Sequence, residues 1–101
     1  MLGRFEEAVL VALMKRPDQT INDVHEALCD MLKKEVALGA IFTTLDRLTE
    51  KKFVDRRKGD PLPQRGGKAR NYYTITGGGR QAVMDAQRAI PSMIESTALA
   101  G

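Results

Sequence analysis

The sequence predicts a mainly α-helical domain with a small β-hairpin, arranged as a winged helix-turn-helix: three helices plus a wing, with a C-terminal helix for dimerisation. Three observations support this fold class. Three helical patterns of apolar residues follow one another, two short β-rich segments then flank a loop rich in glycine and proline, and a last helical pattern ends the sequence. We expect residues 1–76 to form the winged helix-turn-helix and residues 77–101 the dimerisation helix and tail, as one compact unit overall.

The first two helices are predicted from the spacing of apolar residues and from signals at their ends. Residues 3–15 place apolar side chains on most sides of a helix, which favours a central position, and Pro17 ends that helix. The second helix is expected to begin after Thr20, a good N-cap residue, with Asp23 three residues later in the place of the Glu or Gln of a full capping box. Its apolar residues share one face, which predicts core packing: Ile21, Val24, Leu28, Met31 and Leu32.

The third helix, expected over residues 38–52, is the candidate for contacting DNA. Its inner face is predicted to comprise Leu38, Ile41, Leu45 and Leu48, with Phe42 alongside. Its outer face begins with small side chains and ends with cations: Ala40, Thr43, Thr44, Arg47 and Lys51. Small side chains let the backbone approach base edges, threonine can contact a phosphate or a thymine methyl, and Arg or Lys can bind phosphate or guanine. The alternative is an ordinary exposed helix face.

A wing is predicted where two strands, over residues 53–58 and 70–75, flank a loop over residues 59–69. Pro61 and Pro63 prevent regular strand pairing in this loop, and its glycines permit tight turning and close approach to a neighbour. Cations surround these glycines. The wing is therefore expected to contact DNA through Arg65, Gly67, Lys68 and Arg70.

Positive charge is concentrated between the third helix and the wing. Residues 47–70 hold nine Lys and Arg against three acidic residues, a net charge of +6, so the rest of the chain carries −3 within the overall +3. A positive stripe on an acidic body is typical of proteins that bind polyanions, because each neutralised phosphate releases counterions. The alternative is that these charges serve solubility alone.

A last helix is expected to begin near Thr76, whose hydroxyl can cap it. An exposed apolar stripe on such a helix is a liability for a monomer, so packing against a second copy is the favoured explanation, and packing onto the first helix is the alternative. Pro91 is expected to interrupt the stripe, which comprises Val83, Ala86, Ile90, Met93 and Ile94.

Catalysis and tightly bound cofactors are not expected. The chain has one histidine, His25, and one cysteine, Cys29, and no Ser/His/Asp or Cys/His set with a third orienting group is legible. His25 and Cys29 are four residues apart, so they could share a helix face and begin a metal site. Two ligands do not make a site, and a metal would need carboxylates or a second subunit. We therefore expect no enzyme activity, no cofactor and no metal.

The protein is expected to be cytoplasmic. No apolar run approaches the roughly 20 residues that span a bilayer. Glu6 and Glu7 stand where a signal peptide would have positive charge and then an apolar run.

Several of these motifs, in this order, resemble the PadR family of winged-helix transcriptional regulators. The matching segments are LGRFEE at residues 2–7, LGAIFTTLDRL at 38–48, PLPQRGGKAR at 61–70 before Tyr72 and Tyr73, and TGGGR at 76–80. The resemblance implies a homodimer whose third helix enters the major groove, whose wings contact the flanking backbone, and whose C-terminal helix helps to hold the dimer together. It also implies control of transcription, most often repression.

The expected function is that of a sequence-specific regulator, in the first place a repressor, that binds double-stranded DNA as a homodimer. The alternative is a winged-helix module that docks onto an acidic protein without touching DNA. The operator, the regulated gene and any small-molecule effector are not legible in the sequence.

Overall fold

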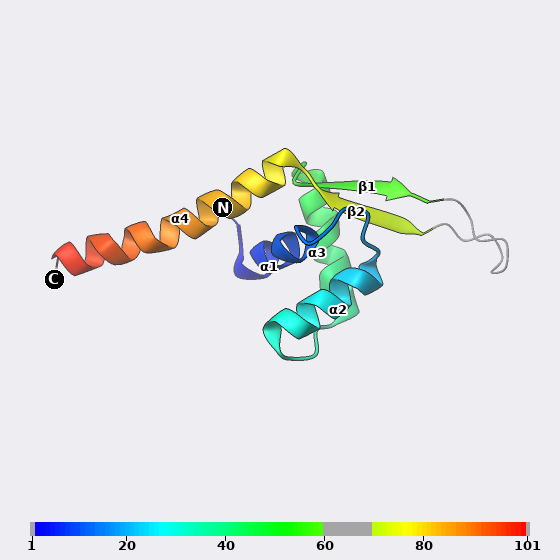
Figure 1. The fold of residues 1–101 in the computed structure, drawn as a ribbon, viewed down its shortest axis with the longest axis horizontal. Helices are drawn as coiled ribbons and strands as arrows, with labels where there is room; N and C mark the ends of the chain where they lie inside the picture. Colours follow the sequence, from blue (N-terminus) through cyan, green and yellow to red (C-terminus); the bar gives the residue numbers. More distant parts are fainter. Residues whose placement is uncertain (1, 60–69, 101) are drawn as a thin grey trace.

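A computed structural model describes residues 2–59 and 70–100, and the side chains of these residues as far as residue 88. Its elements follow the predicted order and confirm the predicted fold class (Figure 1). Three helices come first, then an antiparallel hairpin, then a long helix. They are α1 (Arg4–Leu13), α2 (Ile21–Leu32), α3 (Leu38–Glu50), β1 (Val54–Lys58), β2 (Asn71–Ile75) and α4 (Gly77–Ala100).

Side-chain hydrogen bonds mark the starts of two helices where the sequence predicts caps. The Thr20 hydroxyl accepts from the Asp23 N–H at 3.2 Å, and the Asp23 carboxylate accepts from the Thr20 N–H at 2.9 Å. At the start of α4 the Thr76 hydroxyl accepts from the Gly79 N–H at 3.0 Å. All three hydrogen bonds satisfy N–H groups that a helix start leaves without intrahelical partners.

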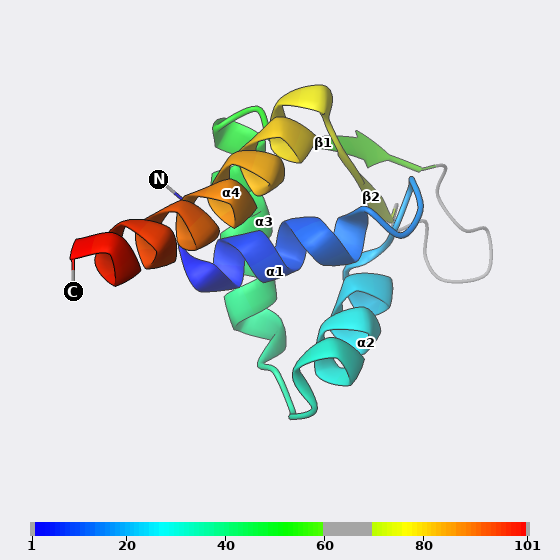
Figure 2. The same cartoon turned by 60° about the vertical axis from the view of Figure 1, so that its left-hand side comes forward.

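Helix α1 lies at the centre of the molecule, as its apolar residues predict. It contacts α2, α3, α4 and β2 (Figure 2). Fully buried residues of α1 pack against those of the other elements, so one core holds the three helices and the hairpin together. This core includes Val9, Leu10, Leu13, Val24, Leu28, Ile41, Leu45, Leu48, Tyr73 and Val83.

The hairpin is joined to the helices through the segment between α1 and α2. Strands β1 and β2 pair from Val54 opposite Ile75 to Lys58 opposite Asn71. On the other edge of β2, Gln19 exchanges two backbone hydrogen bonds with Tyr73, of 2.8 and 3.0 Å. The buried Gln19 amide also donates to the carbonyl oxygens of Ala12 in α1 and of Arg16 just after it, so the base of the wing has a fixed position relative to α1.

Helix α4 differs from the expectation in two ways. It runs through Pro91 as one helix of 24 residues, so the prediction that Pro91 interrupts it is wrong. Proline removes one intrahelical hydrogen bond, and residues of higher helix propensity two positions away on either side, Ala89 and Met93, favour continuation of the helix. The first turns of α4 also pack on the body, where Val83 is buried, while the rest projects away from it (Figure 1). None of the helices in the described ranges is long and apolar enough to cross a membrane.

Candidate nucleic-acid interface

The exposed side of α3 carries most of the residues that the sequence assigns to DNA contact. Ala40, Thr43, Arg47 and Lys51 are all exposed. The first three lie along one side of the helix at intervals of three and four residues, so their side chains are neighbours. Small side chains thus precede a cation on a surface that the protein body leaves open.

The predicted division of α3 into inner and outer faces is wrong at three positions. Thr44, expected on the outer face, is buried, with 8% of its surface exposed. Phe42 and Leu38, expected on or beside the inner face, are exposed, at 47% for Phe42. The reason is that α3 packs against α1, α2 and β1 together, and the arc covered by these elements extends past Ile41 toward Thr44 and not toward Phe42. Thr44 is therefore not offered to DNA.

Lys51 is held by an ion pair with α1. Its ammonium lies 2.9 Å from a carboxylate oxygen of Glu6, whose side chain is only 14% exposed. The pKa of Glu6 is lowered, first by the hydrogen bond from the Gly3 N–H and then by that from Lys51, with a smaller contribution from the charge of Arg47 and an opposing one from burial. In the free protein, Lys51 therefore stabilises the contact between α1 and α3.

This ion pair predicts a difference in acid stability. Because the pKa of Glu6 is lower in the folded protein, the stability that its charge contributes is complete above the ordinary value of 4.5 and disappears as the pH falls through the folded pKa. Glu6→Gln should reduce the free energy of unfolding by about 1 kcal/mol at pH 7 and by much less at pH 3. Urea unfolding at both pH values measures this. Glu26→Gln, at an exposed position of α2, is the control and should show no such difference.

Two arginines of β1 are also paired within the protein. Arg56 lies 2.9 Å from Asp46 of α3, which neutralises an acid on the exposed side of that helix. Arg57 lies 3.4 Å from Asp18, and its guanidinium lies over the ring of Tyr72, 4.8 Å from the centroid. These contacts fix the wing base to α3 and to the segment before α2. The positive stripe predicted from residues 47–70 is thus partly neutralised.

A shallow hollow joins α3 to the base of the wing. Its volume is about 160 Å³, and its lining comes from the start of α2, from α3 and from the start of β2. Arg70 and Phe42 both line it, so the predicted wing cation Arg70 lies near the exposed N-terminal half of α3. The other lining residues are Thr20, Ile21, Asn22, Asn71 and Tyr73. The remaining predicted wing contacts, Arg65, Gly67 and Lys68, lie outside the described residues.

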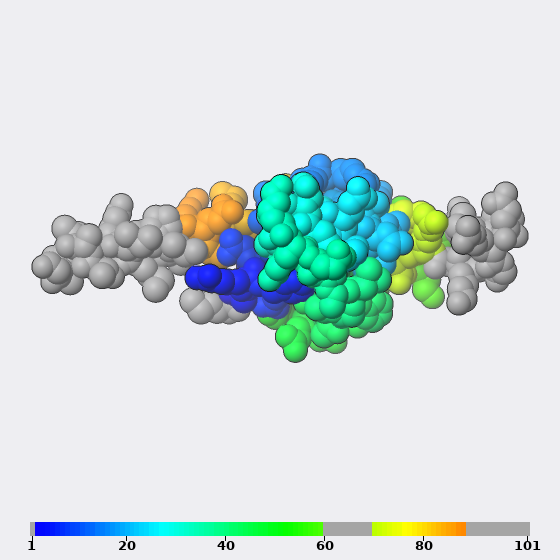
Figure 3. All heavy atoms as spheres, turned by 90° about the horizontal axis from the view of Figure 1, so that it is seen from below, coloured from blue at the N-terminus to red at the C-terminus, as the bar shows by residue number. Residues whose placement is uncertain are grey.

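Cations therefore lie on both sides of an exposed ridge of α3, the surface that Gly39 and Thr43 form between Phe42 and Arg47. Phe42, beside Arg70, and Arg47 are five residues apart, which places them about 140° apart around the helix axis. Between them the ridge presents Gly39 and Thr43, both exposed. The wing base and α4 project from opposite ends of the body that carries this ridge (Figure 3). A convex helix flanked by cations is the shape that a DNA groove and its two phosphate backbones accommodate.

Several solved structures have a similar fold. A PadR-like transcription factor from B. fragilis superimposes with a TM-score of 0.77 at 18% identity, over 96% of this chain and 89% of that one. A PadR family regulator from C. difficile gives 0.70 at 17% identity, over 93% and 94%. The complex structure of hsRosR-S1, from H. salinarum, gives 0.70 at 26% identity, over 91% and 75%.

The comparison by sequence gives the family. No curated protein matches the chain. The profile described as the transcriptional regulator PadR-like family matches residues 9–85, from the middle of α1 into α4, and so includes every element of the described interface. The chain belongs to the PadR-like family of transcriptional regulators, and is a DNA-binding regulator and not an enzyme.

Proposed function

We propose that the protein is a homodimeric repressor that recognises a specific operator in double-stranded DNA. The observation that carries this proposal is the exposed ridge of α3 with Arg47 on one side and Arg70 on the other. Small side chains on the ridge allow close approach to base edges, and the flanking cations match the two phosphate backbones of a groove.

Each predicted residue except the buried Thr44 has a role in this arrangement. Ala40 and Thr43 face the bases, and Arg47 reaches a guanine or a phosphate at the groove edge. Lys51 gives up its ion pair with the Glu6 carboxylate and binds a phosphate instead. Phe42, which the apolar periodicity assigned beside the core, adds an exposed ring that can contact a thymine methyl. The wing contacts the backbone through Arg65, Gly67, Lys68 and Arg70.

Fluorescence anisotropy with the DNA upstream of the protein's own gene tests operator recognition. One duplex should bind at least 100-fold more tightly than a scrambled duplex of the same composition, and its affinity should fall steeply with added salt. Equal and weak affinity for all duplexes would reject operator recognition. Capture of a protein partner that survives nuclease treatment, without DNA binding, would instead support a protein-docking module. Repression itself is tested by transcription from the bound promoter, which should fall as the protein is added.

The homodimer is proposed from α4. This helix leaves the body after its first turns, and Met84 near its start is exposed. The sequence places Ile90, Met93 and Ile94 at helical spacing further along, which gives a second copy an apolar stripe to cover. Residues 77–101 thus act as the dimerisation segment, and residues 1–76 as the DNA-binding segment.

Charges introduced into this stripe should dissociate the dimer. The double variant Ile90→Asp, Ile94→Asp buries two carboxylates at the proposed interface, so light scattering should give the mass of one chain where the unmodified protein gives two. Ser92→Asp adds a charge on the opposite side of the helix by its spacing and should leave the dimer intact. A monomeric unmodified protein at micromolar concentration would contradict the proposal.

A further inference from the structure

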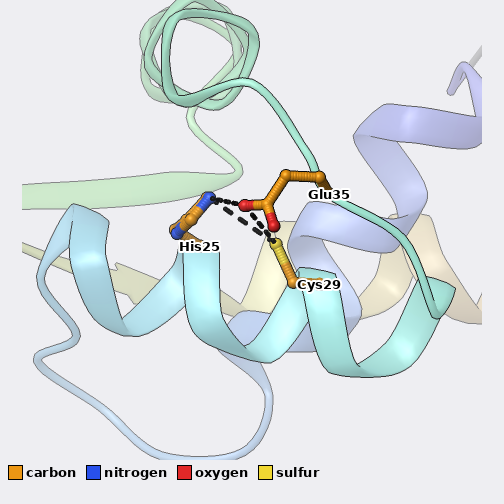
Figure 4. Close-up of side chains that lie close together, drawn as sticks. All are labelled: His25, Cys29 and Glu35. Carbon is orange, nitrogen blue, oxygen red and sulfur yellow. Dashed lines mark hydrogen bonds and ion pairs between the residues drawn. The ribbon is translucent and has the colours of Figure 1, made fainter.

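Three side chains of metal-ligating type meet beside the turn that joins α2 to α3 (Figure 4). His25 and Cys29 lie one helical turn apart on α2, and Glu35 approaches them from the segment after that helix. One ligand atom from each residue lies within 4.8 Å of the other two. We propose that this cluster is a binding site for a divalent transition-metal ion of borderline softness, with Zn²⁺ as the ion of first choice. The site requires neither DNA nor a second copy and goes beyond the proposed function.

The distances between the ligand atoms fit a single tetrahedral ion. Nε2 of His25 lies 3.5 Å from Sγ of Cys29 and 3.7 Å from a carboxylate oxygen of Glu35, and that oxygen lies 4.0 Å from Sγ. Zinc bonds of about 2.0 to 2.3 Å in tetrahedral geometry place ligand atoms about 3.3 to 3.6 Å apart. Of these three distances, only the two to Glu35 have to shorten, by a few tenths of an ångström. The Glu35 side chain is 88% exposed and has the freedom to move closer.

The chemistry of the ligands selects the class of ion. A thiolate and an imidazole favour Zn²⁺ and its neighbours Co²⁺ and Ni²⁺ over Mg²⁺ and Ca²⁺, which prefer all-oxygen sites. The carboxylate of Glu35 completes three protein ligands and leaves the fourth position to water. His25 and Cys29 are half-buried and Glu35 is exposed, so the site is open to solvent on the side of Glu35.

Binding requires an exchange of partners at His25. Its Nε2 lies 2.9 Å from the carbonyl oxygen of Val36, and because a carbonyl only accepts, that nitrogen carries the proton in the metal-free protein. Coordination through Nε2 replaces this hydrogen bond by the metal bond. The imidazole proton moves to the other ring nitrogen, and the thiol proton of Cys29 goes to solvent.

The position of the site would let a bound ion link α2 to the segment before α3. Lys33, the C-cap residue after α2, has a left-handed φ of 56° and turns the chain back toward Cys29. Glu35 follows two residues later, and Ala37 is the N-cap residue of α3. An ion held by His25, Cys29 and Glu35 therefore joins α2 to the segment that leads into the DNA-facing helix.

Titration of the reduced, metal-free protein with Co²⁺ tests the site. We expect one ion per chain, a thiolate-to-cobalt charge-transfer band and the intense visible bands of tetrahedral Co²⁺, all removed by one equivalent of Zn²⁺. Zn²⁺ should also raise the melting temperature by roughly 5 °C or more at saturating concentration, because it binds the folded state. Weak octahedral spectra, or no saturation near one equivalent, would overturn the proposal.

Three variants distinguish Co²⁺ binding at this site from nonspecific Co²⁺ binding elsewhere on the protein surface. Cys29→Ser should abolish the charge-transfer band, and Glu35→Gln, at an exposed position where folding is not at risk, should weaken Co²⁺ binding at least ten-fold. Glu26→Gln removes a neighbouring carboxylate of α2 that is not part of the cluster and should bind Co²⁺ like the unmodified protein. If Glu35→Gln binds Co²⁺ with unchanged affinity, the three-ligand site is wrong. This conclusion holds even if Cys29→Ser fails to fold.

Discussion

Gly79→Ala is expected to lower the free energy of unfolding by about 2 to 3 kcal/mol, whereas Gly77→Ala, two residues earlier in the same helix, is expected to leave it unchanged or raise it slightly. Both residues belong to the first turn of α4. They differ in what a methyl group would meet. At Gly77 the Cβ of alanine would have no neighbouring atom within 4 Å.

At Gly79 the added carbon would collide with backbone. It would overlap the carbonyl oxygen of Phe53 and lie 2.8 Å from Cγ1 of Ile75. The Phe53 carbonyl cannot retreat, because it accepts a hydrogen bond of 3.0 Å from the Thr76 N–H while the Phe53 N–H donates to Leu48 at 2.9 Å. The strain therefore spreads into the end of α3 and the start of β1, both of which support the proposed DNA interface.

Chemical denaturation of Gly79→Ala, Gly77→Ala and the unmodified protein, monitored by circular dichroism, measures the difference in the free energy of unfolding. Gly78→Ala is a further control, since its added carbon would make only ordinary contacts, the nearest at 3.6 Å. Equal stability of Gly79→Ala and Gly77→Ala would show that α4 does not approach the α3–β1 junction as closely as the structure has it. A selective loss for Gly79→Ala would support that approach.

The order and limits of the elements could be predicted from the sequence because their signals are local. Thr20 with Asp23, and Thr76 before its glycines, are caps that a reader of the sequence can recognise, and the structure confirms both. The apolar spacing of α2 correctly predicts the burial of Val24 and Leu28, although Leu32, which the same spacing assigns to the core, is exposed at 36%. Local signals thus predict the fold class and most element boundaries within two residues.

The faces of α3 could not be predicted in the same way. A helix packed by three neighbours buries a wide arc, and the apolar pattern does not say on which flank that arc ends. Thr44 is buried although it is polar, and Phe42 is exposed although it is apolar, because α1, α2 and β1 together decide the boundary. Because of this tertiary packing, the exposed side of α3 includes Gly39 and Phe42 rather than Thr44.

Two contacts of the candidate sites depend on residues that are distant in sequence. Lys51 pairs with Glu6 across 45 positions, and Glu35 meets His25 through a turn that needs Lys33 in a left-handed conformation. No spacing rule predicts either contact, because both arise from how segments fold back on one another. From the sequence no metal is expected, because His25 and Cys29 would need carboxylates or a second subunit, and only the fold brings Glu35 to them.

Arg47→Ala is expected to weaken binding to the preferred operator at least ten-fold and to relax the preference for one base pair. Arg47 is exposed beside Thr43, and among the residues that the structure describes no ion pair engages its guanidinium. A guanidinium at a groove edge that binds guanine contributes about 1 to 3 kcal/mol of discrimination. Competition of the operator with single-base variants, followed by fluorescence anisotropy, measures both effects.

Arg88→Ala supplies the matched control, because it removes the same charge from an exposed position of α4, away from the α3 ridge. Electrostatic attraction at long range depends on net charge, so both variants lose that part equally. Only contact with DNA distinguishes them. If Arg88→Ala weakens operator binding as much as Arg47→Ala and neither changes the base preference, Arg47 contributes through net charge alone and the proposed orientation of α3 in the groove is wrong.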